Sequence, residues 1–306
     1  MKNIFQLTKR NVLLFFRSKQ TVFASLFSSF ILVVLYFLFI AKLYTQGFNE
    51  MSGLALSAKQ LNALIYVQMI MGVIVINSVS LSTGMFSFMA KDIEDHKTQA
   101  FLLTKLKPHE LMLSYLISAI FISFVLNFFV LLVSVIIIGA TTSFWMSAGA
   151  FFSIAGVTLL SSVIGCAIML LVTSLIRSST ALGVISGFVG TILGFLCGIY
   201  MPFENLGKGA TYVGSFLPFT HITIWLKQIA LGDAFAQFSV TSEMAEGMQY
   251  WFSAKNIGLC GANVPLWGMI LISTLVGIIC FVLSIFLVKN LLKNSNKKVL
   301  KRNHEN

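Results

Sequence analysis

The sequence predicts an all-α, polytopic membrane protein with six transmembrane helices, and two observations lead to this class. Hydrophobic residues make up 57% of the 306 residues and charged residues only 10%, whereas a soluble domain carries about 25% charged residues. Apolar runs of about 20 residues also recur, each long enough to cross a hydrocarbon core of about 30 Å as a helix. A soluble domain of this length could not bury so much apolar surface.

Residues 1–20 are expected to form an amphipathic connecting helix that lies in the membrane interface. Apolar residues such as Phe5, Val12 and Phe15 share one helical face. Basic residues on the opposite face include Lys9, Arg10 and Arg17. This 3.6-residue periodicity is typical of an interfacial helix. A cleavable signal is not expected, because basic residues continue to Lys19 and the next run is long enough to span. Two interpretations of this helix are open. It is either a simple anchor in the membrane interface or a lever that joins the first span to a cytoplasmic partner.

The six transmembrane helices follow from the apolar runs. They are expected at residues 22–41, 63–89, 111–138, 150–176, 181–200 and 266–288. With the N-terminus inside, the inner segments hold 16 of the 21 Lys and Arg residues, which fits the basic bias of cytoplasmic segments. Both termini, including a basic tail at 289–306, are therefore expected in the cytoplasm, and the protein in the plasma membrane. The net charge of +11 reflects this bias and anionic lipids rather than nucleic acid.

A long extracellular segment, residues 201–265, separates the fifth and sixth spans. Its apolar stretch Phe216–Gly232 has only about 17 residues, which suits an interfacial or re-entrant helix better than a span. Residues 233–256 are more polar and are expected to form an exposed cap. Cys197 and Cys260 lie near this face, so a disulfide between them is one alternative, although free thiols are favoured.

Residues 90–110 form a charged segment between the second and third spans, expected to be a cytoplasmic coupling loop. Ionisable residues gather here more densely than elsewhere in the body of the chain, including Lys91, Asp92, Glu94, Asp95 and Lys97. A short helix is expected near residues 104–106. Pro108 and Glu110 then predict the start of the third span, because proline is tolerated at the first helical position and a nearby acid complements the helix dipole.

The six expected spans contain no Asp, Glu, Lys, Arg or His. Ion-coupled transporters need an ionisable group or a broken helix at mid-membrane, and channels line their pores with charge or carbonyl groups. Intramembrane hydrolysis needs a nucleophile with a base, or paired acids, at membrane depth. The cysteines also lack metal-ligand spacing. We therefore expect neither a catalytic residue nor a metal site, and the chain is not expected to be an enzyme.

Uncharged residues within the spans have two interpretations. Gln68 and Asn77 either form hydrogen bonds between helices or line a substrate pathway, for which Phe30 and Phe195 are further candidates. Glycines recur three and four residues apart in the fifth span, at Gly183, Gly187, Gly190, Gly194 and Gly198. Such spacing lets helix backbones approach closely, so tight packing is expected there, with a surface that slides during transport as the second interpretation.

A transporter without internal energy coupling needs an external energy source. The sequence contains no G-x-x-x-x-G-K-[ST] phosphate-binding loop. An ATPase would then be a separate polypeptide that carries the ATP and Mg²⁺ and docks on the cytoplasmic face. The charged segment 90–110 and the connecting helix 1–20 are the candidates to receive it.

The whole layout resembles the type-2 permease subunits of ATP-binding-cassette (ABC) transporters of the exporter class. Leu7–Phe39 looks like the family's basic connecting helix running into the first span. Lys91–Tyr115 is similar to its coupling loop, and residues 198–233 resemble the outer end of its fifth span with the re-entrant helices that follow. The resemblance implies a working unit of two permeases, identical or paralogous, and two nucleotide-binding subunits. It also implies that Glu94 is the coupling acid.

Two functions from different classes remain. The first is an ATP-driven exporter of a hydrophobic or amphipathic substrate, such as a drug, peptide or lipid. Closure of the ATPase dimer would push the coupling loop and connecting helix and switch a cavity between the first, second and fifth spans. The second is a non-transporting membrane partner, such as a sensor or immunity-type subunit, that recruits an ATPase. Polysaccharide export is a lesser alternative, because the outer segment is longer than in compact polysaccharide exporters.

Overall fold

The computed structural model describes residues 2–35, 56–95, 97–98, 106–176, 178–259 and 262–304, and these are almost entirely helical. In chain order the elements are α1 (Lys2–Arg17), α2 (Lys19–Leu35), α4 (Ala58–Glu94), α6 (Pro108–Thr142), α7 (Ala148–Leu175), α8 (Ser179–Leu196), α9 (Phe203–Ser215), α10 (Pro218–Gln237), α11 (Ser242–Trp251), β1 (Gly258–Leu259), β2 (Ala262–Asn263) and α12 (Leu266–His304). Cys260 and most of the short helix expected near 104–106 lie outside the described residues.

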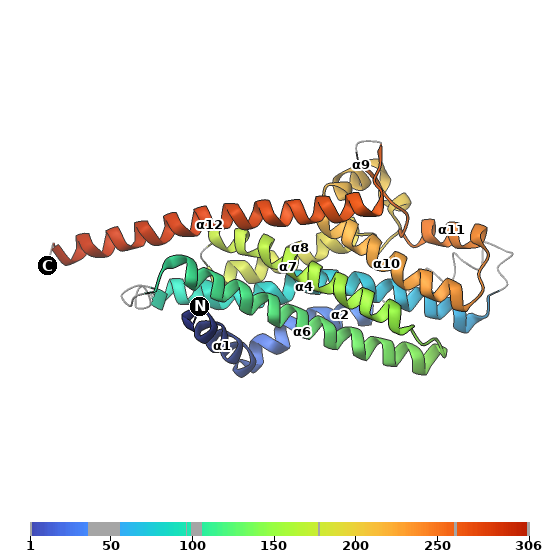
Figure 1. Cartoon of the computed structure of the whole chain (residues 1–306), viewed down its shortest axis with the longest axis horizontal. Coiled ribbons are helices and arrows are strands. Elements are labelled where there is room, and N and C mark those ends of the chain that lie inside the picture. The colour runs from blue at the N-terminus through green and yellow to red at the C-terminus, as the bar shows by residue number, and fades with distance from the viewer. Residues whose placement is uncertain are drawn as a thin grey trace.

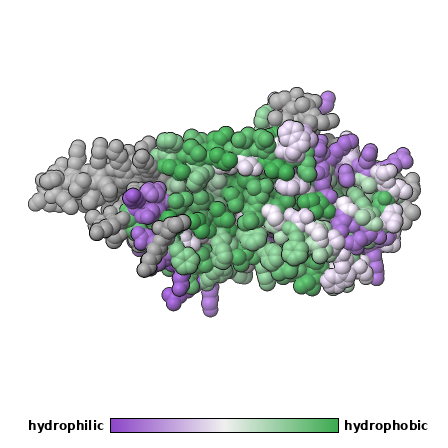
Figure 2. Space-filling model, in the orientation of Figure 1, coloured by the Kyte–Doolittle hydropathy of each residue, from purple (hydrophilic) through white to green (hydrophobic). Residues whose placement is uncertain are grey.

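Long helices run alongside one another in a bundle with two distinct ends (Figure 1). The chain termini lie toward one end, which we call the basal end, and α9 and α11 lie toward the other, which we call the distal end. An apolar band covers the visible face of the bundle, with polar residues gathered toward the ends (Figure 2). This distribution matches a protein whose middle part lies in a lipid bilayer.

Five of the described helices are long and apolar enough to cross a membrane: α4, α6, α7, α8 and the Leu266–Leu287 part of α12. The prediction of a polytopic, all-α membrane protein is therefore confirmed. The first expected span, at 22–41, begins within α2, and its residues 36–41 lie outside the described part of the chain.

Helix α4 is the centre of the bundle. It packs against α2, α6, α7, α8 and α10, and its residues from Ala63 to Val79 are nearly all buried. A helix that is apolar all round must be kept from water, and here its neighbouring helices do this. The surrounding helices instead expose large apolar side chains, among them Phe121, Phe152, Phe188 and Phe286. Such exposure suits side chains that contact lipid.

The helix ends follow local capping chemistry. A capping box starts α4, in which Ser57 Oγ accepts from the Gln60 N–H at 3.3 Å and Gln60 Oε1 accepts from the Ser57 N–H at 2.8 Å. α4 continues to Glu94, past the expected boundary at residue 89, so the first part of the charged segment is helical rather than a loop. α6 begins at Pro108, and the Glu110 carboxylate accepts from the Lys107 N–H at 3.0 Å.

The segment 201–265 is folded into the distal end rather than spread over the surface. Its main helix, α10, has 20 residues and packs against α4, α7 and α12. Beyond α10, Met248 and Phe252 are buried. The expected exposed cap at 233–256 is therefore partly wrong, because apolar side chains fix it to the bundle. Gly207 adopts φ 77°, a left-handed conformation that glycine tolerates, and kinks α9 there.

Candidate functional site

A cavity of about 680 Å³ opens between α2, α4 and α8, the helices at the first, second and fifth expected spans. Among the described residues, its lining contains hydroxyl, amide, glycine and aliphatic groups and no carboxylate or amine. The lining residues are Gln20, Thr21, Ser25, Ile31, Ile76, Ser80, Thr83, Gly84, Ser87, Gly183, Ser186, Gly187, Gly190, Thr191 and Tyr200. The cavity therefore offers hydrogen bonds without a fixed countercharge.

Helical periodicity brings these small residues to one surface. On α4, Ser80, Thr83 and Ser87 follow one another at intervals of three and four residues, which places them on one face. At Gly84 the Ser25 side chain of α2 comes so close that an added methyl would lie 2.5 Å from Ser25 Oγ. The cavity is thus walled by α2 on one side at a close helix–helix contact.

The five glycines expected in the fifth span, four in α8 and Gly198 just after its end, divide into two groups. Gly183 and Gly187 line the cavity, and nothing lies within 4 Å of where their side chains would begin. Gly190 also lines the cavity, but an added methyl would meet Ile76 at 3.6 Å. Gly194 lies against the ring of Tyr200, and Gly198, at φ 61°, lies against Ser253. The close packing predicted for all five occurs from Gly190 onward, where α8 approaches its neighbours.

None of the four residues proposed from the sequence for the substrate pathway lines this cavity. Gln68 and Asn77 are fully buried in α4, whereas Phe30 and Phe195 are 62% and 42% exposed. The sequence analysis missed the hydroxyl-bearing face. The signal that finds it is the spacing of Ser80, Thr83 and Ser87, which resembles that of an amphipathic helix with hydroxyls in place of charges.

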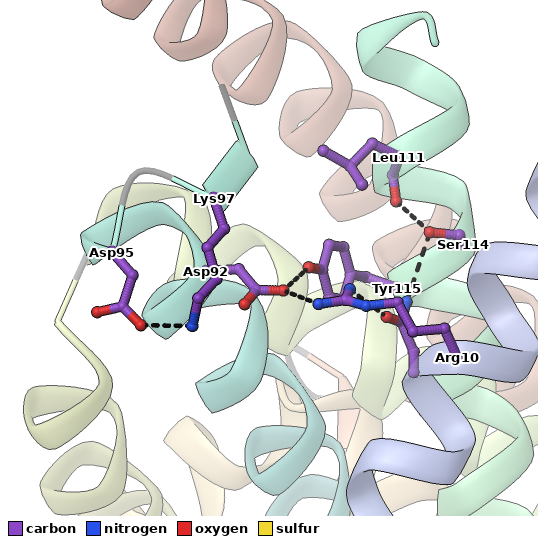
Figure 3. Close-up of polar contacts among 8 residues, drawn as sticks. Arg10, Asp92, Asp95, Lys97, Leu111, Ser114 and Tyr115 are labelled. Carbon is purple, nitrogen blue, oxygen red and sulfur yellow. Dashed lines mark hydrogen bonds and ion pairs between the residues drawn. The ribbon is translucent and has the colours of Figure 1, made fainter. Parts of the chain in front are cut away.

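A polar network joins α1 to α4 and α6 at the basal end (Figure 3). Arg10 Nη2 donates to Asp92 Oδ2 at 3.1 Å, and the Tyr115 hydroxyl donates to the same oxygen at 2.5 Å. Burial alone would lower the pKa of Arg10. The interactions with Tyr115 and Asp92 outweigh this effect and hold the pKa of Arg10 above its usual value. Asp92 is only 7% exposed. The network therefore fixes the connecting helix to the ends of two long helices.

The face of α1 that meets the bundle is more polar than expected. Leu7, Asn11 and Phe15 are buried, and Asn11 Nδ2 donates to Ser114 Oγ at 3.5 Å. Phe5 lies on the expected apolar face but is 73% exposed. Its exposure fits a helix with one side on the bundle and another available to lipid.

The charged residues after Asp92 have different partners. Glu94 accepts two hydrogen bonds from Ser179, from its N–H at 3.2 Å and from its hydroxyl at 3.1 Å. Asp95 and Lys97 form an exposed ion pair at 2.7 Å (Figure 3). Lys91, Lys9 and Arg17 are exposed. Lys9, Arg17 and Lys91 therefore lie at the surface, while the buried Asp92 and the exposed Glu94 join helices.

Lys227 forms an unexpected buried site at the distal end. Its side chain on α10 is fully buried, and Nζ donates to the carbonyls of Gly198 at 2.6 Å and Phe252 at 2.8 Å. These carbonyls follow the ends of α8 and α11, where carbonyl groups lack helical partners and attract a positive charge. Burial lowers the pKa of Lys227 to about 7. The sequence analysis had counted Lys227 only as an outer charge.

Metal chemistry has no support among the described residues, where no cluster of three His, Cys, Asp or Glu side chains could hold an ion. Cys166, Cys197 and Cys280 are free thiols in this part of the chain. Cys197 is buried with its sulfur 3.7 Å from the Thr220 hydroxyl oxygen.

Comparison with known protein families gives one match. The pattern described as ABC-2 family transporter protein matches residues 43–286, a range that includes the cavity walls α4 and α8 and all of the distal end. The comparison with curated proteins gives no match.

Proposed function

Because the chain belongs to the ABC-2 family of transporter proteins, we propose that this permease exports a hydrophobic or amphipathic substrate. The observation that carries the proposal is the cavity between α2, α4 and α8, whose described lining is rich in hydroxyl groups and holds no carboxylate or amine. Transport by alternating access requires such a binding space between helices whose ends can separate.

The cavity chemistry supports this substrate class. An ion or a strongly charged solute would lose its hydration there without meeting an opposite charge, which is costly. Serine and threonine hydroxyls together with the Tyr200 ring suit a largely apolar molecule that carries some hydrogen-bonding groups. Drugs, lipids and apolar peptides share this character.

The energy for transport is proposed to come from a separate ATPase subunit that carries ATP and Mg²⁺. It would dock on the basal end, which we place in the cytoplasm together with both termini. The connecting helix α1 suits this role because Arg10 is bonded to Asp92 at the end of α4. Pressure on α1, or on the exposed residues Lys91, Asp95 and Lys97, would therefore reach a wall of the cavity directly. The working unit would contain two permeases and two ATPase subunits.

Transport in proteoliposomes tests the proposal. The chain and its partner ATPase are reconstituted, and ATP-dependent movement is followed for rhodamine 6G, a fluorescent phosphatidylethanolamine and a labelled apolar peptide. Gly187→Leu, which fills open cavity space, is expected to reduce movement of the transported probe at least tenfold. Gly156→Leu is the matched control, because Gly156 is an exposed α7 glycine with equally open surroundings outside the cavity.

Two results contradict the proposal. Equal transport by the two variants would show that the cavity is not the pathway. No ATP-dependent movement of any probe, together with retained ATPase binding, would favour the alternative of a non-transporting membrane partner.

A further inference from the structure

Helix α8 is held at both ends by charged side chains that belong to other elements. Glu94, the last residue of α4, bonds Ser179 at the start of α8. Lys227 of α10 bonds the carbonyl of Gly198 just after its end. The acid at the N-terminus and the base at the C-terminus both match the helix dipole.

The basal contact closes an open interval between α4 and α8. Near the middle of the bundle the two helices touch, since a methyl at Gly190 would lie 3.6 Å from Ile76. Toward the basal end the surroundings of Gly187 and Gly183 are open. This open interval ends at Ser179, where Glu94 joins α4 to α8 again. Ser179 lies about 17 Å from Gly190 along the axis of α8, toward the basal end.

The two contacts differ in their exposure to water. Both hydrogen bonds between Glu94 and Ser179 are exposed, and exposed polar contacts contribute little because water competes for both partners. Lys227 and its two bonds are buried, so separating them would leave buried carbonyls without partners. The distal end is also closed by Tyr200, whose ring lies against Gly194.

We propose that Glu94 is the gate latch of the cavity at its basal mouth, and that Lys227 is the fixed pivot about which α8 swings when this latch opens. Glu94 is then a positioning residue that holds α8 against α4, and its release admits substrate from the basal side. This role differs from direct contact with an ATPase. It rests on the proposal that the cavity is the substrate pathway.

Two cysteine reporters test the latch without substrate or ATPase. Ser186→Cys lies in the cavity wall, and Ile199→Cys lies in the packed distal end, where Ile199 is only 1% exposed. Each is placed in the full chain with its four natural cysteines changed to serine, in lipid nanodiscs. The measured quantity is the labelling rate with a water-soluble, charged maleimide.

Glu94→Ala is expected to raise labelling of Ser186→Cys about threefold or more, in line with the modest strength of an exposed contact, and to leave Ile199→Cys unchanged. Glu94→Gln keeps an acceptor oxygen and should give an intermediate rate. Glu110→Ala is the matched control, because Glu110 also accepts from a helix-start N–H but at α6. It should leave both rates unchanged.

Lys227→Met should have the converse effect. It should raise the labelling rate of Ile199→Cys above its value with Lys227 present by a larger factor than that of Ser186→Cys. If that variant does not fold, hydrogen exchange of the wild-type chain gives the same comparison, with amides at 179–187 expected to exchange faster than those at 194–200. Unchanged Ser186→Cys labelling in folded Glu94→Ala would overturn the latch. Faster exchange at the distal end would overturn the pivot. Neither result depends on transport, so failure of the proposed function is detected separately.

Discussion

The basal and distal ends of the bundle are held together by different chemistry. At the basal end, the carboxylates of Asp95 and Glu94 meet Lys97 and Ser179 in exposed contacts, and Asp92 alone of the described acids there is buried. At the distal end, Lys227 is buried and bonds only backbone carbonyls among the partners described. Exposed charge pairs break and re-form at little cost, whereas buried ones must remain intact. Movement is therefore expected to start at the basal end.

The same difference extends to how each end is connected to the core. Arg10, Asp92 and Tyr115 join three helices through one shared carboxylate oxygen. A displacement of α1 thus reaches α4 and α6 together. The distal end has close glycine contacts instead, such as Gly72 against Ile199, which resist displacement because packed interiors have little free space.

The largest effect is expected from Lys227→Met. Loss of the amine leaves the buried carbonyls of Gly198 and Phe252 without a donor, at about 1–3 kcal/mol each, which is partly offset because the buried amine no longer has to be desolvated. The variant should therefore melt several degrees below wild type in detergent, as followed by tryptophan fluorescence. A variant as stable as wild type would show that Lys227 does not hold the distal end.

A smaller effect is expected from Asp92→Ala at the basal end. The change removes hydrogen bonds to a charged group, which contribute about 1.5–3 kcal/mol, but the Arg10 side chain is 31% exposed and can turn to water. We expect a modest loss of stability together with loss of stimulation of the partner ATPase by substrate. Asp92→Asn keeps an acceptor for Tyr115 and should retain more of both properties. Normal stimulation in Asp92→Ala would exclude this network from coupling.

Sequence alone predicts the basal end better than the distal end. The charged segment and the basic connecting helix are visible in the sequence because they interrupt long apolar runs, and α6 begins at Pro108 as its proline indicates. The bond between Arg10 and Asp92 joins positions 82 residues apart, and no periodicity reveals which of several charges will pair.

The distal site was beyond prediction for a physical reason. Lys227 stands in a stretch that has the composition of an interfacial helix, where a lysine normally reaches water. Its burial depends on the meeting of the ends of α8 and α11, which is a property of the tertiary structure. The hydroxyl face of the cavity is a different case, since Ser80, Thr83 and Ser87 show helical spacing and were recognisable.

A change of pH should affect the distal end. The pKa of Lys227 is lowered from 10.5 to about 7 in the folded chain, so between these values the unfolded chain binds the proton more tightly. Stability should therefore rise with pH from about 7 toward 10.5, by at most about 1.4 kcal/mol per pH unit. The melting temperature of wild type should rise between pH 7 and 8 relative to that of Lys227→Met. Parallel curves of melting temperature against pH for the two proteins would contradict this titration of Lys227. The neighbouring titratable group is Cys197, which acts on the pKa of Lys227 through its charge.

Salt should give the smallest effect and should act on the basal end alone. Raising the ionic strength from 0.05 M to 0.5 M shortens the Debye length from above 10 Å to below 8 Å. This weakens the attraction of the Glu94 carboxylate to the positive end of the α8 dipole by a few tenths of a kcal/mol. Hydrogen exchange at the start of α8 should therefore become slightly faster in high salt, while exchange at 194–200 stays constant. In Glu94→Gln the salt dependence should disappear, because the charge that is screened is absent. A salt response of equal size at both ends would mean that water reaches the distal contacts too, and the distinction between a basal latch and a distal pivot would fail.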